Sequence, residues 1–102
     1  TAKDGHLSAA ICHAANVCHR VGAETSQEAI AEQFKGNDSA LATFEDFKEH
    51  LAVNGLKDFK PVMGPVLEID RRKEIFTGAH AEAANKHLSR HYRPEFGLTA
   101  DV

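Results

Sequence analysis

The fold is decided by a run of small and apolar residues over positions 5–22, with the sequence GHLSAAICHAANVCHRVG. Its apolar positions recur every three or four residues, the spacing that places side chains on one face of an α-helix. That face comprises Leu7, Ala10, Ile11, Ala14, Val17, Cys18 and Val21. Asp4 is a candidate N-cap and Gly22 a candidate stop, so the pattern predicts a helix over residues 5–21. Its many alanines allow close approach, and we expect this helix to pack against another element.

Two further helices are predicted before the middle of the chain. Thr25 and Glu28 have the spacing of a capping box and predict a short helix over residues 27–34. A longer helix is predicted over residues 39–53 from a second apolar face. That face comprises Leu41, Phe44, Phe47 and Leu51.

The pattern changes after Gly55. Residues 56–65 contain two prolines and a glycine and predict an irregular connection. Residues 66–77 contain two short apolar stretches around a charged turn, which predicts a β-hairpin. A last helix is predicted over residues 80–92, because Pro94 cannot continue it.

These elements define the expected fold class. It is α+β and mostly helical, with about four helices and one short β-hairpin. The chain has 102 residues, which is the length of one typical domain, so we expect a single domain over residues 1–102.

Charge and composition exclude several classes of partner. The formal net charge is −3, from 12 basic and 15 acidic side chains, whereas nucleic-acid binding needs a concentrated basic surface. The apolar runs are too short to cross a membrane. Cys12 and Cys18 fall six positions apart on one predicted helix, too far apart for a disulfide. Two unpaired thiols fit a reducing compartment, and we expect a cytoplasmic location.

Histidines are the main candidates for chemistry, because the chain has seven of them. His80, His87 and His91 would share one flank of the last predicted helix and are candidate metal ligands. The alternative, which we favour, is a polar flank that faces solvent. Two histidines at i and i+4 can hold one zinc ion, but a site still needs a third or fourth ligand, and none is obvious in the sequence.

His6 and His13 are seven positions apart and share a face of the first predicted helix. They are candidates for lining a substrate pocket that another domain supplies, since histidine is the usual acid–base group near neutral pH. The alternative is that they form hydrogen bonds locally at a helix interface. The sequence has no glycine-rich cofactor loop, no P-loop and no glycine-framed serine elbow, so no catalytic or cofactor-binding residue is assigned.

Three ordered stretches carry a set of motifs. The first contains Gly5-His6-Leu7-Ser8, Cys12-His13, Asn16, Arg20 and Gly22. The second contains Gly64-Pro65, Leu67-Glu68-Ile69-Asp70 and Glu74-Ile75-Phe76-Thr77-Gly78. The third contains Glu82-Ala83-Ala84-Asn85, Leu88-Ser89-Arg90 and Tyr92-Arg93-Pro94-Glu95-Phe96. Together they resemble the C-terminal end of bacterial oxidoreductases of the glucose–fructose oxidoreductase and inositol dehydrogenase family, over nearly the whole chain.

This resemblance implies that the chain is the C-terminal fragment of a larger oxidoreductase. Such enzymes have an N-terminal dinucleotide-binding domain, transfer a hydride between NAD(P) and a sugar or polyol, and often oligomerise through the C-terminal sheet. The expected partners are therefore the missing dinucleotide-binding domain or further copies of the chain. The family's lysine motif and catalytic Asp-x-x-x-His pair have no counterpart here. We expect no activity and no bound cofactor for this chain alone. His87 and His91 stand where the family commonly has an apolar and an acidic residue.

Three functions remain as hypotheses. The favoured one is the C-terminal structural and substrate-side portion of an NAD(P)-dependent sugar or polyol oxidoreductase, which predicts exposed apolar surface on the first helix. The second is a free-standing helical module that dimerises through that surface. The third is a small metal-binding protein that uses His80, His87 and His91.

Overall fold

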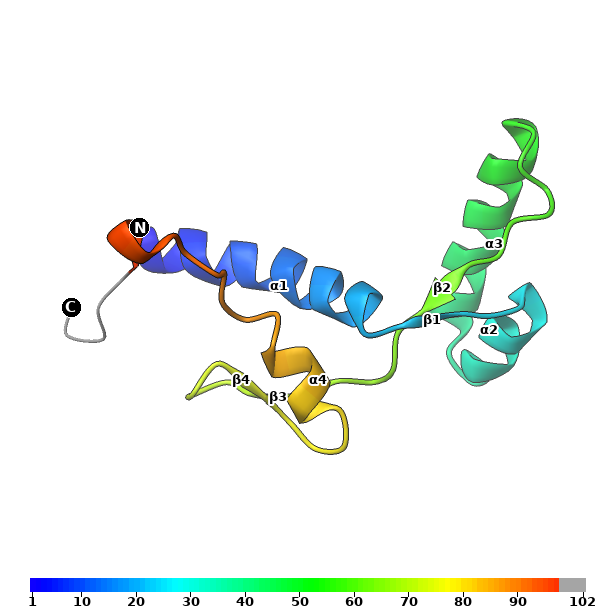
Figure 1. Cartoon of the computed structure of the whole chain (residues 1–102). Coiled ribbons are helices and arrows are strands. Elements are labelled where there is room, and N and C mark those ends of the chain that lie inside the picture. Colours follow the sequence, from blue (N-terminus) through cyan, green and yellow to red (C-terminus); the bar gives the residue numbers. More distant parts are fainter. Residues whose placement is uncertain (98–102) are drawn as a thin grey trace. The chain divides into compact units, whose positions relative to one another are not determined.

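The structure is a computed structural model that describes residues 1–97 (Figure 1). Within these residues it has four α-helices and two antiparallel pairs of short strands, which confirms the α+β, mostly helical fold class. The elements are α1 (Ala2–Arg20), β1 (Ala23–Glu24), α2 (Gln27–Gln33), α3 (Asp38–Val53), β2 (Val62–Met63), β3 (Glu68–Asp70), β4 (Ile75–Thr77), α4 (Ala81–Asn85) and the 3-10 helix η1 (Pro94–Phe96). None of the helices in residues 1–97 is long and apolar enough to span a membrane.

The chain divides into two compact units, where the sequence predicts one domain. Unit 1 combines residues 1–21 with the C-terminal part from residue 65, and unit 2 consists of residues 22–64. Each unit is described by itself below.

Helix α1 of unit 1 begins three residues before its predicted start. Thr1 is the N-cap, and its side chain accepts a hydrogen bond from the backbone N–H of Asp4 while the Asp4 carboxylate bonds back to Thr1. This reciprocal pair satisfies N–H groups that the first helical turn leaves without partners. Asp4, predicted to be the N-cap, is therefore the third residue inside the helix, and Val21 is the C-cap.

The predicted hairpin over residues 66–77 is confirmed. Strands β3 and β4 are antiparallel, with Ile69 opposite Phe76. The turn between them holds the charged residues 71–74, and Asp70 stabilises it by accepting hydrogen bonds from the N–H groups of Arg72 and Lys73. Glu74 ends the turn with φ +54°, in the left-handed conformation that is unfavourable for most residues other than glycine and asparagine.

Helix α4 corrects the predicted helix over residues 80–92, because it spans only Ala81–Asn85. The N–H groups of His87 and Leu88 bond to carbonyls three residues back, so the helix tightens and stops. Leu88 and Tyr92, predicted to lie on its apolar face, are about half exposed. A short helix needs an apolar face packed on a neighbour, and Leu88 and Tyr92 are too exposed to provide one.

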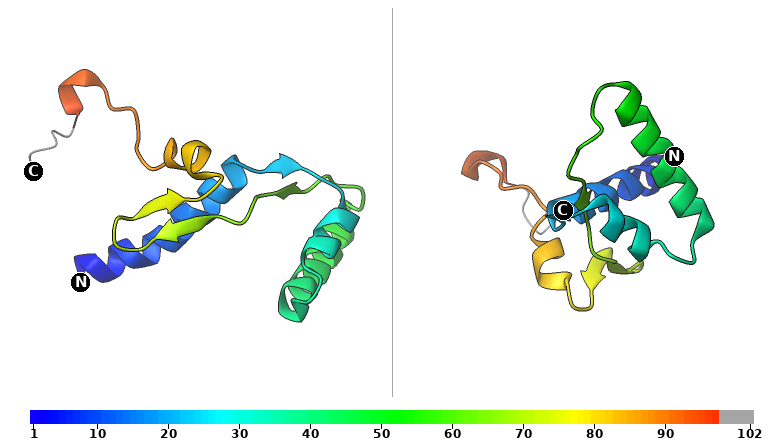
Figure 2. Two further views of the ribbon diagram at one scale, coloured as in Figure 1. Left: turned by 90° about the horizontal axis from the view of Figure 1, so that it is seen from below. Right: turned by 90° about the vertical axis from the view of Figure 1, so that its right-hand side faces the viewer.

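The core of unit 1 is small. Val17 of α1, Phe76 of β4 and Ala84 of α4 are buried together, and Ala14, Val21 and Leu67 pack around them. Figure 2 shows the hairpin lying along α1, with α4 beside β4. Three elements that are far apart in sequence therefore meet at these few side chains.

Unit 2 contains α2 and α3, joined through Gly36, which has φ +88°. Helix α2 confirms the predicted position, but its N-cap is Ser26, whose side chain accepts a hydrogen bond from the N–H of Ala29. The predicted Thr25–Glu28 capping box is therefore wrong by one residue. Helix α3 spans nearly the predicted range and ends before Gly55, whose φ is +84°.

The strand pair of unit 2 was not predicted. Residues 56–65 were expected to be irregular, but Val62 and Met63 form β2, which pairs with β1 in antiparallel register. Gly22, predicted to be a helix stop, has a second reason to be glycine. A Cβ atom at this position would lie 2.7 Å from the carbonyl oxygen of Met63. The two strands can approach at this end only because the side chain is absent.

Two buried residues hold unit 2 together. Ile30 of α2 and Phe44 of α3 are buried, while Phe47 packs edge-to-face on Phe59 with 5.6 Å between the ring centroids. Phe47, predicted to be buried, remains about half exposed, so the apolar face of α3 is covered in part.

Candidate functional site

A histidine–carboxylate pair joins α1 to the tip of the hairpin in unit 1. His6 Nε2 lies 2.8 Å from Glu74 Oε2, although the two residues are 68 positions apart. The side chains are 57% and 55% exposed, so water screens the pair. Half-exposed pairs of this kind contribute about 1 kcal/mol or less to stability. The pair can still fix where the turn lies against the helix.

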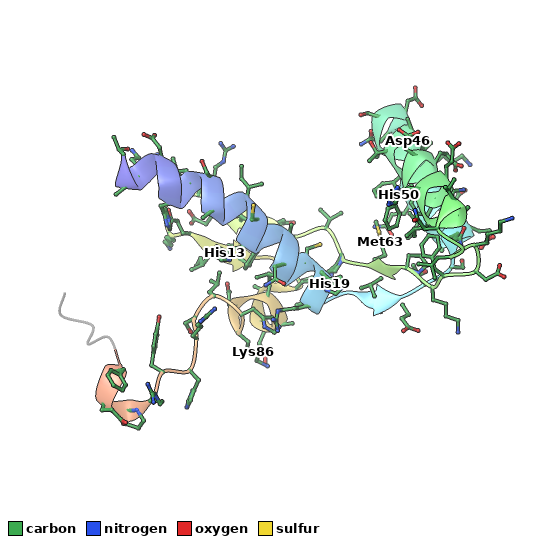
Figure 3. The ribbon with its side chains drawn as sticks, turned by 90° about the horizontal axis from the view of Figure 1, so that it is seen from above. His13, His19, Asp46, His50, Met63 and Lys86 are labelled. Atoms are coloured by element: carbon green, nitrogen blue, oxygen red, sulfur yellow. The ribbon has the colours of Figure 1, made fainter. Side chains whose placement is uncertain are left out.

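His13, the second candidate for lining a pocket, lies on the same flank of α1 but is not brought to His6. Seven residues of helix separate the two by about 10 Å along the axis. His13, labelled in Figure 3, is exposed, and no hydrogen bond or ion pair to it occurs within residues 1–97. Among the described residues, His6 therefore has a hydrogen bond to another element and His13 has none.

The three candidate metal ligands do not share a helix. His80 is the N-cap of α4, His87 follows its last turn, and His91 lies beyond it in a segment without regular structure. The predicted spacing depended on a helix over residues 80–92, which the structure ends at Asn85. In the part of the chain that the structure describes, no group of three or more His, Cys, Asp or Glu residues is placed to hold a metal ion.

Asn85 makes the most specific polar contact in unit 1. Its Oδ1 accepts a hydrogen bond from the N–H of Phe76 at 2.8 Å, and its Nδ2 donates one to the carbonyl of Phe76 at 2.9 Å. The side-chain amide thus replaces a neighbouring strand at the outer edge of β4. It also explains why α4 remains attached to the hairpin although it has little more than one turn.

Much of the apolar surface of unit 1 is uncovered. Within the described residues, the stripe predicted on α1 is buried only at Val17. Leu7 and Ile11, in the N-terminal half of the stripe, are 49% and 74% exposed. The N-terminal half of the stripe therefore adds apolar side chains to the surface of unit 1.

Unit 2 has two shallow hollows. The larger has a volume of about 600 Å³ and lies between residues 24–28 and 57–60, where Gln27 donates hydrogen bonds to the carbonyls of Lys57 and Phe59. The smaller, about 420 Å³, is lined mainly by Phe34, Phe44 and Phe47. Figure 3 also shows Asp46 and His50 on α3, where both side chains are exposed. Both hollows of unit 2 are open to solvent. The larger is lined mostly by polar and charged side chains, whereas a typical ligand pocket is concave and mostly apolar.

The comparisons with known proteins give no relatives. No family model, no curated protein and no solved structure matches this chain. The function must therefore be inferred from the chain itself.

Two residues of this site were missed by sequence reasoning. Glu74 was predicted to be part of a charged turn. Its contact with His6 on α1 could not be predicted, because the two residues are 68 positions apart and no local sequence pattern relates them. Asn85 did carry a usable signal. Asparagine is a poor residue for a helix interior and is favoured at helix ends, since its side chain competes for backbone hydrogen bonds.

Proposed function

We propose that this chain is the C-terminal structural and substrate-side portion of an NAD(P)-dependent sugar or polyol oxidoreductase, without activity on its own. The observation that supports this proposal is the uncovered half of the apolar stripe on α1, at Leu7 and Ile11. A helix that has lost its neighbour exposes such a stripe. The ordered motifs that resemble the oxidoreductase family supply the class of the missing neighbour.

In this proposal α1 packs against the rest of the parent protein. His6 and His13 lie on the flank of α1 next to the stripe and line the substrate side. NAD(P) is bound by the missing dinucleotide-binding domain, and this chain supplies no ligand to it. The unpaired Cys12 and Cys18 are in keeping with a cytoplasmic location.

The first test is the composition of the native particle. It would be isolated with an antibody against this chain, its mass measured by light scattering, and the mass of each constituent determined. We expect the sequence to occur within or beside a longer polypeptide, and the particle to bind NADH or NADPH in a fluorescence titration. A particle that contains this chain alone and binds no nicotinamide would contradict the proposal.

A matched pair of variants tests the role of the stripe. Ile11→Ser should lower the stability of the complete particle by about 2 kcal/mol, the cost of exposing a buried isoleucine. In the isolated chain the same change should cost about 0.5 kcal/mol or less, because Ile11 is already exposed. Ala9→Ser, on the opposite face of α1, is the control and should have a small effect in both. Equal effects of Ile11→Ser in the two states would count against burial of this face.

The alternative is a free-standing helical module that dimerises. The same observation favours it, since a second copy could cover Leu7 and Ile11 as well as another domain could. It predicts a homo-oligomer whose thermal stability rises with protein concentration, and the mass measurement separates the two cases.

A further inference from the structure

The two outer edges of the hairpin differ in their hydrogen bonding. At β4, the N–H and the carbonyl of Phe76 both point outward and are bonded to Asn85. Because the backbone N–H and carbonyl of Phe76 point away from β3, Phe76 and Ile69 form a non-hydrogen-bonded pair of the antiparallel ladder. The N–H and the carbonyl of Ile69 therefore point outward at the opposite edge.

The outer edge of β3 is open within unit 1. No hydrogen bond to the N–H or the carbonyl of Ile69 occurs among the described residues. The left view of Figure 2 shows α4 beside β4, and shows no other described element of unit 1 along the far side of β3. An exposed strand edge of this kind is a template for a further strand.

The side chains at this edge are suited to an added strand. Ile69 is 47% exposed and lies on the same face of the hairpin as its partner Phe76, which is buried. An apolar residue placed opposite Ile69 would extend the core outward.

Charge argues against a second copy as the occupant. Antiparallel pairing of β3 with itself, centred on Ile69, would place Glu68 of each copy opposite Asp70 of the other. A shift of this register by two residues, which pairs Ile69 of one copy with Leu67 of the other, would place Glu68 opposite Glu68. Like charges directly opposite each other destabilise a strand pair. A strand with basic side chains at these positions would instead meet carboxylates.

We propose that the open edge of β3 binds an extended peptide segment of another polypeptide, with an apolar residue opposite Ile69 and basic residues opposite Glu68 and Asp70. The proposal concerns peptide recognition and holds whether or not the parent protein is an oxidoreductase. It assigns Asn85 a second role, because the capped edge of β4 leaves β3 as the side on which the sheet can grow.

The test uses the full 102-residue chain and a synthetic peptide of alternating valine and lysine. Hydrogen exchange measured by NMR should show the Ile69 amide slowed at least tenfold at saturating peptide, with Phe76 unchanged. Two control peptides should give no slowing: one with glutamate in place of lysine, and one N-methylated at the residues that pair with β3.

Two variants of the chain sharpen the test. Ile69→Thr keeps the N–H and should bind the peptide within a few-fold of the original affinity, whereas Ile69→Pro removes the N–H from the outer edge only and should abolish binding. Retained exchange protection of the Phe76 amide shows that the hairpin survives. If Ile69→Pro unfolds the hairpin, the N-methylated peptide provides the same comparison on the unaltered chain.

Several results would overturn the proposal. These are an Ile69 amide that exchanges equally fast with and without the valine–lysine peptide, equal binding of the glutamate peptide, and protection of Ile69 that grows with protein concentration in the absence of peptide. The last would show that a second copy occupies the edge.

Discussion

At the scale of single residues, Gly22 and Gly5 differ in whether their surroundings leave room for a side chain. Gly22 lies where a Cβ atom would meet the backbone of Met63, at 2.7 Å from the carbonyl oxygen and 3.0 Å from the carbonyl carbon. Gly5 lies inside α1, and apart from its chain neighbours and the adjoining helix backbone nothing lies within 4 Å of a Cβ atom added there. The fold therefore has no room for a side chain at position 22, whereas it has room for one at position 5.

This contrast predicts effects of opposite sign. Gly22→Ala should lower the free energy of unfolding by about 1–3 kcal/mol, because β1 and β2 must separate to admit the methyl group. Gly5→Ala should raise it by about 0.5–1 kcal/mol through helix propensity. Urea denaturation followed by circular dichroism measures both, and a neutral Gly22→Ala would contradict the close approach of the two strands.

The start of α1 carries the one clear electrostatic perturbation among the described residues. The Thr1 hydroxyl donates a hydrogen bond of 2.6 Å to the Asp4 carboxylate, and this bond holds the pKa of Asp4 below its ordinary value. Because the folded-state pKa is the lower one, the ionised carboxylate stabilises the helix start above the ordinary pKa. That stabilisation is lost as the pH falls through the lowered pKa.

Thr1→Val should therefore raise the pKa of Asp4 toward its ordinary value and increase fraying of the first turn of α1. An NMR titration of the Asp4 carboxyl carbon measures the change. Thr43→Val on α3 removes a hydroxyl that bonds to the carbonyl of Ser39 and is the matched control, with no effect on Asp4. An unchanged pKa in Thr1→Val would show that the hydroxyl is not the cause.

At the scale of elements, Asn85 is what attaches α4 to the hairpin. Asn85→Ala removes one donor and one acceptor at once and leaves the Phe76 N–H and carbonyl without these partners. We expect a loss of about 1–3 kcal/mol in the free energy of unfolding and faster hydrogen exchange at the Phe76 amide. Lys86→Ala, next in sequence, removes only an exposed ion pair with Glu82 and should cost about 0.5 kcal/mol or less. Equal effects of the two substitutions would refute this role of Asn85.

The sequence predicted those elements that local patterns determine. The positions of α1, α2, α3 and the hairpin followed from apolar spacing and turn residues, although the N-caps predicted at Asp4 and Thr25 were wrong. The predicted helix over residues 80–92 was wrong beyond Asn85, because helical spacing at Leu88 and Tyr92 stabilises a helix only where a neighbour covers it. The pair of β1 and β2 was missed because each strand has two residues, too few to show an alternating pattern.

The candidate site was predictable to a smaller extent. His6 was selected, but its partner Glu74 depends on how two elements 68 residues apart come together. The histidines at positions 80, 87 and 91 were grouped by a helix that ends before two of them. Local sequence determines helix faces, whereas contacts between elements depend on the tertiary fold, and those contacts define a site.

At the scale of the whole molecule, the amount of buried apolar surface is small. The buried hydrophobic residues within the described part are Val17, Ile30, Phe44, Phe76 and Ala84, divided between the two units. Small chains bury a low fraction of their surface even when well packed, and their stability is correspondingly marginal. The two small cores are therefore expected to give this chain low intrinsic stability.

We expect the isolated chain to unfold with a free energy below about 5 kcal/mol, the lower end for natural domains. Urea denaturation at several protein concentrations measures this value. A midpoint that rises with concentration would indicate self-association and would favour the dimerisation module. A concentration-independent free energy well above this range would show that the chain needs no partner to be stable.

The bond between Asn85 and Phe76 also has a consequence for the order of folding. It spans nine residues, so the loop that must close to form it is short and its closure costs little chain entropy. The contacts that attach α1 span 47 residues from Cys18 to Pro65 and 68 from His6 to Glu74, and such distant contacts form more slowly. The hairpin and α4 should therefore assemble first, as a local nucleus onto which α1 docks later.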